Sequence, residues 1–118
     1  MHQIETLSYN AQPVAANPAA AYLASLAPGS RRAQAGALAW LAAEASGGRV
    51  DADEFPWHEL RFVHTHALRA RLEERFAPAT ANRYLAALRG ALLSARRLGL
   101  LGVAADELAP DLEPVRGW

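Results

Sequence analysis

Apolar residues recur every three or four positions along most of this chain, which is the spacing of amphipathic helices. No segment alternates apolar and polar residues over the length of a strand. Leu68, Leu72 and Phe76 are each four residues apart. A second stripe follows later in the chain and consists of Ala81, Leu85, Leu88, Leu92 and Ala95, with Tyr84 beside it. The pattern predicts an all-α fold with four main helices and a core that contains Leu72, Leu85, Leu88 and Leu92, with Trp40 and Leu41 against them.

Prolines, glycines and short polar residues predict where these helices begin and end. Asn17-Pro18 is typical of a helix start, and Pro28-Gly29 predicts the end of this short first helix. Ser30 and Thr65 are predicted to cap the second and third helices. The predicted helices cover 18–26, 31–46, 66–76 and 78–98, Gly47-Gly48 and Gly99 are predicted stops, and short helical turns are expected within 57–63 and 100–108.

Two of these helices have a face made of small residues and arginines. Small side chains let a helix backbone come close to a partner, and arginine can bond to phosphate or to guanine with two parallel hydrogen bonds. In the helix at 31–46, Ala33, Ala37, Trp40 and Leu41 share the predicted core face. The predicted outward faces are Arg32, Ala35, Ala39, Ala42, Ala43 and Ser46 in that helix, and Arg83, Ala86, Ala87, Gly90, Ser94 and Arg97 in the last.

The composition narrows the class of protein further. The chain has 118 residues, 52% of them hydrophobic and 20% charged, which is typical of one globular domain. It has no cysteine, and the N-terminus lacks the pattern of a secretory signal, so a cytoplasmic protein without a membrane span is expected. The formal net charge is +0, but residues 61–97 hold eight arginines against two glutamates. This basic stretch indicates either solvated helix faces or a local surface for an anionic partner.

No residue pattern in the chain indicates an active site or a cofactor. His64 and His66 are two residues apart and so point in different directions on a helix, which disfavours a shared metal ion. His2 and His58 add no ligand spacing, so surface or capping roles are expected for the histidines. Glu73-Glu74 are adjacent and make a poor acid–base pair. We therefore expect no metal, no cofactor and no catalysis by this chain alone.

The residues from Pro78 to Leu101, PATANRYLAALRGALLSARRLGLL, resemble the last long helix of the core-binding domain of tyrosine recombinases, the phage integrase family. That family shows a Thr, then Asn-Arg, then Leu and Leu-Arg, and closes on an aliphatic-Gly-aliphatic run. The stretch from Tyr22 to Arg32 resembles the family's first helix and the turn into the second. Phe55-Pro56-Trp57 and the helix after Thr65 also fall in place, so that the resemblance covers about residues 17–101.

The resemblance implies a SAM-like orthogonal bundle of four to five helices that clamps double-stranded DNA. The helices at 31–46 and 78–98 match the two that approach the major groove in the family. Many relatives have Thr where this chain has Ala33, so that contact is not carried over. The implied DNA contacts are Ser30, Arg31, Arg32, Gln34, Thr80, Asn82, Arg83 and Arg89.

The resemblance also implies a division of the chain and a role for its parent. Residues 1–16 are expected to form a flexible N-terminal arm, 17–109 the core-binding domain, and 110–118 a linker toward a catalytic domain that the sequence does not contain. The catalytic domain of the parent and the protomers of a recombinase tetramer on DNA are the implied partners. The chain is thus expected to bind DNA in site-specific recombination and DNA integration, and to cleave no strand itself.

A different class of function fits the same charges. A small helical protein–protein interaction module would use the basic stretch to bind an acidic partner. The two hypotheses differ in the partner of the arginines, which is DNA in the first and an acidic protein in the second.

Overall fold

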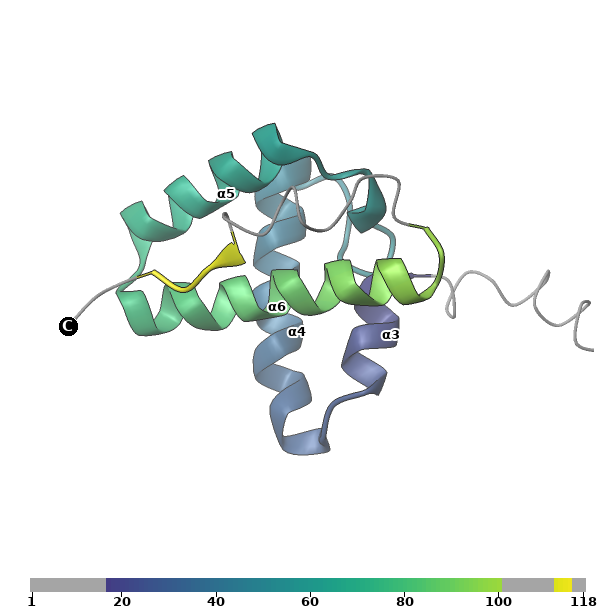
Figure 1. The fold of residues 1–118 in the computed structure, drawn as a ribbon. Coiled ribbons are helices and arrows are strands. Elements are labelled where there is room, and N and C mark those ends of the chain that lie inside the picture. The colour runs from purple at the N-terminus through teal and green to yellow at the C-terminus, as the bar shows by residue number, and fades with distance from the viewer. Residues whose placement is uncertain (1–16, 101–111, 116–118) are drawn as a thin grey trace, which may run out of the picture.

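The computed structural model describes residues 17–100 and 112–115, and all regular structure within these ranges is helical. Four α-helices and one short 3-10 helix follow one another along the chain (Figure 1). The predicted all-α class is confirmed. The elements are α3 (Pro18–Ala24), α4 (Pro28–Ser46), η1 (Trp57–Glu59), α5 (Phe62–Arg75) and α6 (Pro78–Arg97).

Helix α6 lies at the centre of the bundle. It contacts α3, α4, α5 and η1, and in Figure 1 it crosses in front of α4 with α5 on one side and α3 on the other. The predicted leucine stripe faces this core: Leu85, Leu88 and Leu92 are at most 2% exposed. Leu72 of α5 and Leu41 of α4 are fully buried against them, as predicted.

A second buried cluster fixes the loop between α4 and η1. The indole of Trp57 is fully buried, and its Nε1–H donates to the carbonyl of Ala52 at 2.9 Å. Phe55 packs on Trp57 with ring centroids 4.7 Å apart. The side chain of Asn17, the N-cap of α3, donates to the Phe55 carbonyl, so that the start of α3 is tied to this loop.

The boundaries of the first two helices differ from the prediction. Helix α3 ends at Ala24, and Pro28 begins α4 instead of ending α3. Proline suits the first turn of a helix because its φ is already helical and its missing N–H has no partner there. The prediction of Ser30 as the cap of α4 is therefore wrong: the N-cap is Ala27, and Ser30 lies exposed in the first turn.

Helix α5 begins four residues before the predicted position, so the prediction of Thr65 as its cap is also wrong. The N-cap is Arg61, whose backbone N–H donates to Nδ1 of His64 at 3.0 Å. His64 therefore has the capping role expected for a histidine. Thr65 is buried with Leu68 and Leu72, and its hydroxyl donates to the carbonyl of Phe62. The predicted start of α6 and the predicted glycine stops after α4 and α6 agree with the structure. Gly47 and Gly99 follow these helices with φ values of 68° and 75°.

Half of the predicted outward face of α6 packs inside the protein, whereas Arg83, Ala86 and Arg97 are exposed as predicted. Ala87, Gly90 and Ser94 are buried, because α3 lies against this helix. A Cβ on Gly90 would lie 2.2 Å from the Tyr22 ring, so only glycine admits this approach.

The core face of α4 also differs in part from the prediction. Leu38 and Ala42 are fully buried, although Ala42 was predicted to face outward. Ala33 was predicted to face the core and is exposed, because the first turns of α4 extend beyond the other helices. Ala37 and Leu41 are buried as predicted.

Trp40 is half-buried at the edge of the core rather than in its centre. It forms edge contacts with Phe76 and Tyr84, at centroid distances of 5.3 and 5.7 Å. These three aromatic side chains join α4 to the ends of α5 and α6 that meet at Ala77-Pro78.

The predicted N-terminal arm at 1–16 and most of the predicted helix at 100–108 lie outside the described residues. Within the described residues, no helix is both long and apolar enough to cross a lipid bilayer.

Leu88→Ala should lower the free energy of unfolding by about 2–5 kcal/mol, because the side chain is fully buried where α6 meets the other helices. Denaturant unfolding followed by circular dichroism measures this loss. A variant as stable as the wild type would contradict the central position of α6.

Gly90→Ala should destabilise the fold by about 1–3 kcal/mol, because the added methyl group displaces the Tyr22 ring. Gly36→Ala is the matched control. Gly36 lies in α4 with no heavy atom within 4 Å of the place that its methyl group would take, so the better helix propensity of alanine should stabilise the protein by up to about 1 kcal/mol. Unfolding midpoints of both variants test the α3–α6 contact, and equal midpoints would contradict it.

Candidate nucleic-acid interface

The solvent-facing side of α6 carries a concentration of positive charge. The helix contains four arginines and no acidic residue, and all four arginines are exposed. Arg83 and Arg97 are fourteen residues apart, which places them about 21 Å apart along the helix axis. The arginines of this surface, which we call the α6 basic face, are Arg83, Arg89, Arg96 and Arg97.

Most of these side chains can meet a partner without giving up an ion pair. The guanidinium of Arg83 lies 5.8 Å from the ring centroid of Tyr84, which supports it without neutralising its charge. Arg83, Arg96 and Arg97 form no ion pair with any residue that the structure describes. The exposed residues between these arginines, Ala86 and Leu93, have shorter side chains than arginine.

The start of α4 presents a second, smaller group of cations. Arg31 and Arg32 are both exposed in its first turns, next to Ser30. Arg31 has a structural role, since its Nε donates to the carbonyl of Leu23 at 2.9 Å, and Nη2 reaches that of Ala24 at 3.4 Å. A cation is favourable at the negative end of a helix dipole, so Arg31 closes α3. Arg32 has no such contact among the described residues and faces solvent.

Gln34 is part of the scaffold. Its side-chain oxygen accepts a 2.9 Å hydrogen bond from the hydroxyl of Tyr22, the residue that packs on Gly90. Burial raises the pKa of the Tyr22 phenol above its ordinary value, because the anion would be poorly solvated there. Gln34 therefore holds α3 to α4 through its side-chain oxygen.

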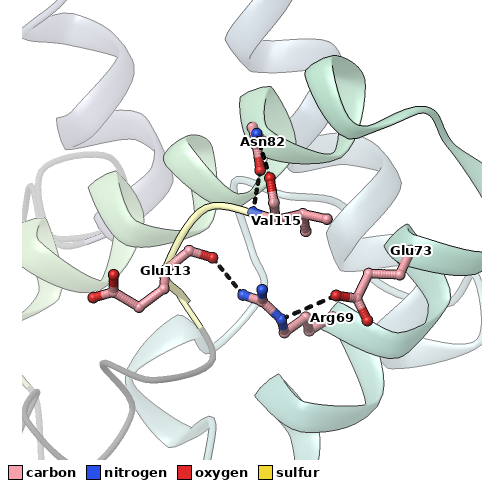
Figure 2. Close-up of polar contacts among 5 residues, drawn as sticks. All are labelled: Arg69, Glu73, Asn82, Glu113 and Val115. Atoms are coloured by element: carbon pink, nitrogen blue, oxygen red, sulfur yellow. Dashed lines mark hydrogen bonds and ion pairs between the residues drawn. The ribbon is translucent and has the colours of Figure 1, made fainter. Parts of the chain in front are cut away.

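Thr80, Asn82 and Arg89 complete the predicted contacts, and two of them already have partners within the chain. Asn82 and Arg89 bond to the backbone of the segment Leu112–Val115 (Figure 2 shows Asn82 with Val115). Thr80 is half-buried in the first turn of α6. Sequence reasoning missed the position of this segment, whose only signal is the pair of apolar residues Leu112 and Val115 among prolines and acids.

The predicted contacts fall into two groups. Ser30, Arg31 and Arg32 lie at the start of α4, which is joined to the end of α3 at the bottom of Figure 1, whereas Thr80 to Arg89 lie along the first half of α6. The predicted contacts omit Arg96 and Arg97, although both are exposed on the same helix as Arg83. Their spacing of about two and four helical turns from Arg89 and Arg83 is the signal that identifies them.

The arginines of α5 contribute less free charge than their number suggests. Arg71 forms an ion pair with Glu44 at 2.7 Å, and Arg69 pairs with Glu73 at 3.4 Å. The number of arginines in the basic stretch therefore overstates the free positive charge that a partner meets on α5. The third arginine of α5, Arg75, is exposed without an ion pair to a described residue, and the larger group of such arginines lies on α6.

An apolar surface lies at the other end of α5. Phe62 and Val63 are 56% and 66% exposed, and Phe62 stacks on His66. Beside them, a pocket of about 240 Å³ opens between α4 and α5, with Val63, Ala67 and Leu68 in its wall. Within the described ranges, no three acidic or histidine side chains are grouped so that they could hold a metal ion.

Arg31→Ala should lower the free energy of unfolding by about 0.5–1.5 kcal/mol, because two carbonyls at the end of α3 lose their donor. Arg32→Ala removes the same charge one residue later and should change stability by no more than about 0.5 kcal/mol. Parallel denaturant titrations measure the difference. Equal losses for the two variants would show that charge, and not the cap on α3, sets the stability.

A search for relatives of the chain finds no matching protein-family model, no matching curated protein and no matching solved structure. A function must therefore be argued from the residues of the chain and their geometry.

Proposed function

We propose that this chain is a double-stranded DNA-binding module, the core-binding domain of a site-specific tyrosine recombinase or integrase. The observation that carries the proposal is the α6 basic face: four exposed arginines on a 20-residue helix that contains no acidic residue. Arginine bonds to phosphate oxygens with two parallel donors and also reads guanine in the major groove. The resemblance of residues 78–101 to the family's DNA-approaching helix supports the same assignment.

The exposed side of α4 supports contact with a large, flat partner. Gly29, Arg32, Gly36, Ala39 and Ala43 are all exposed, so this side has one cation and little side-chain bulk. A helix with such a surface can come within hydrogen-bond distance of a DNA backbone. Helices α4 and α6 pack directly on each other, so a rigid unit would present both.

Five acidic residues of the described chain are placed where they do not cancel the α6 basic face, whereas Glu113 lies beside the Leu112 carbonyl that Arg89 holds. Asp51, Asp53 and Glu54 are exposed in the loop before η1. Glu44 and Glu73 are paired with the arginines of α5. This separation of charges explains how a neutral chain can present a local anion-binding surface.

A protein–protein interaction module is the second candidate, and one observation favours it. The exposed Phe62 and Val63, together with the adjacent pocket, form an apolar patch of the kind found at protein interfaces. This patch lies on α5 and not on the α6 basic face, so the two candidates predict different sensitive residues. Phe62→Ser should leave DNA affinity unchanged if the first candidate holds.

Binding of duplex DNA should depend steeply on salt. With three to five arginines on phosphates, the log–log salt slope of the association constant should be roughly −3 to −5, and Kd should lie near the non-specific range of about 10⁻⁴ to 10⁻⁶ M. Arg83→Ala should weaken binding and reduce the slope by about 1, because one phosphate contact is lost. Fluorescence anisotropy with a labelled duplex at several salt concentrations measures both quantities.

Arg49→Ala is the matched control, since Arg49 is an exposed arginine in the acidic loop and its removal changes the net charge equally. We expect it to leave the slope unchanged. If the wild type shows no salt dependence, or if the two variants behave alike, the α6 basic face is not a DNA surface, and the protein–protein interaction module gains.

A further inference from the structure

Residues Leu112–Val115 lie along α5 and α6 and are fixed by hydrogen bonds to three side chains (Figures 1 and 2). Asn82 makes two of them: its Oδ1 accepts from the Val115 N–H at 2.6 Å, and its Nδ2 donates to the Val115 carbonyl at 3.2 Å. Arg89 donates to the carbonyl of Leu112 at 2.8 Å, and Arg69 donates to that of Glu113. Two helices thus hold one short segment.

All of these bonds are made to the backbone of the segment. Figure 2 shows the carboxylate of Glu113 pointing away from Arg69, while its carbonyl receives the guanidinium. In addition to these hydrogen bonds, the burial of the Leu112 side chain, which is 7% exposed, anchors the segment in the core. The site therefore binds carbonyl and amide groups of the segment's backbone.

The neutral carbonyls of the segment are weaker hydrogen-bond acceptors for a guanidinium than anionic oxygens are. Arg89 carries a full positive charge, its bond goes to a neutral carbonyl, and it forms no ion pair with a described residue. Hydrogen bonds between a guanidinium and an anionic oxygen are roughly twice as strong as bonds between neutral groups, and phosphate offers such oxygens. A polyanion that reaches Arg89 can therefore compete with the Leu112 carbonyl.

The segment occupies two of the residues that the DNA interface would use. Asn82 and Arg89 lie on α6, the helix that presents the basic face. The segment also adds an exposed carboxylate, that of Glu113, one residue after the carbonyl that Arg89 holds, and this charge opposes a DNA backbone. Bound in this way, the segment covers part of the surface and reduces its positive charge.

We propose that Leu112–Val115 is a displaceable strap, and that the phosphate backbone of DNA replaces it on Asn82 and Arg89. This inference rests on the proposed function, because the competitor is the duplex bound to the α6 basic face. The strap sets the apparent DNA affinity: the strapped form binds with fewer contacts, and full binding requires release of the segment. Weakening the strap should raise DNA affinity without any change in the DNA-facing side chains.

The test removes one strap bond and leaves α6 unaltered. Val115→Pro deletes the N–H that donates to Asn82, whereas Val115→Ala keeps it and is the matched control. In the full chain, Val115→Pro should bind duplex DNA up to about fivefold more tightly than Val115→Ala, the shift expected from one net hydrogen bond. In the wild type, the Val115 amide should exchange its hydrogen slowly in free protein and faster when saturating duplex is added.

The outcomes separate the strap from the proposed function. Equal DNA affinity of the two variants, or a Val115 amide that stays protected in the DNA complex, would overturn the strap and leave DNA binding standing. If neither variant nor the wild type binds duplex at low salt, the proposed function fails and the strap fails with it. Circular dichroism of each variant confirms that the fold is intact.

Discussion

Helices α3 and α6 approach each other more closely than side chains of ordinary size would allow, and this approach organises the whole bundle. Tyr22 lies directly on Gly90, and its hydroxyl bonds to Gln34 of α4, so one side chain joins three helices. Helix α3 has seven residues, too few for a stable isolated helix, so its order comes from this packing. Because α6 contacts every other helix, its buried side has to be built from leucines together with alanine, glycine and serine.

The same packing decides where the charge of α6 can go. Nine of its residues are buried, and the arginines occupy positions that remain in solvent. The helix therefore combines a wide internal surface with a narrow external one. The result is a group of four cations spread over the exposed side of a helix whose other side belongs to the core.

The helical class, the span of α6 and its buried leucines could be predicted from the sequence. Apolar residues repeat about every 3.6 positions over a long stretch that has a proline at its start and a glycine after its end, which is typical of one long helix. The starts of α4 and α5 could not be predicted, since Ala27 and Arg61 precede these helices as N-caps and neither is a residue of the usual capping kind. Gly90 was assigned to the outside because periodicity cannot distinguish a small residue that faces solvent from one that admits a neighbouring helix. The contacts of Asn82 and Arg89 with residues 112 and 115 depend on pairing across more than twenty residues, which local patterns do not encode.

The backbone contacts of Leu112–Val115 have a consequence for how this chain can vary. A site that binds carbonyl and amide groups does not depend on the side chains of the residues that carry them, so positions 113 and 114 can change without loss of these hydrogen bonds. Leu112 is different, because its burial sets the register of the residues after it. Natural variation should therefore be wide within the segment and narrow at its anchor, while the number of residues between Leu112 and Val115 should stay fixed.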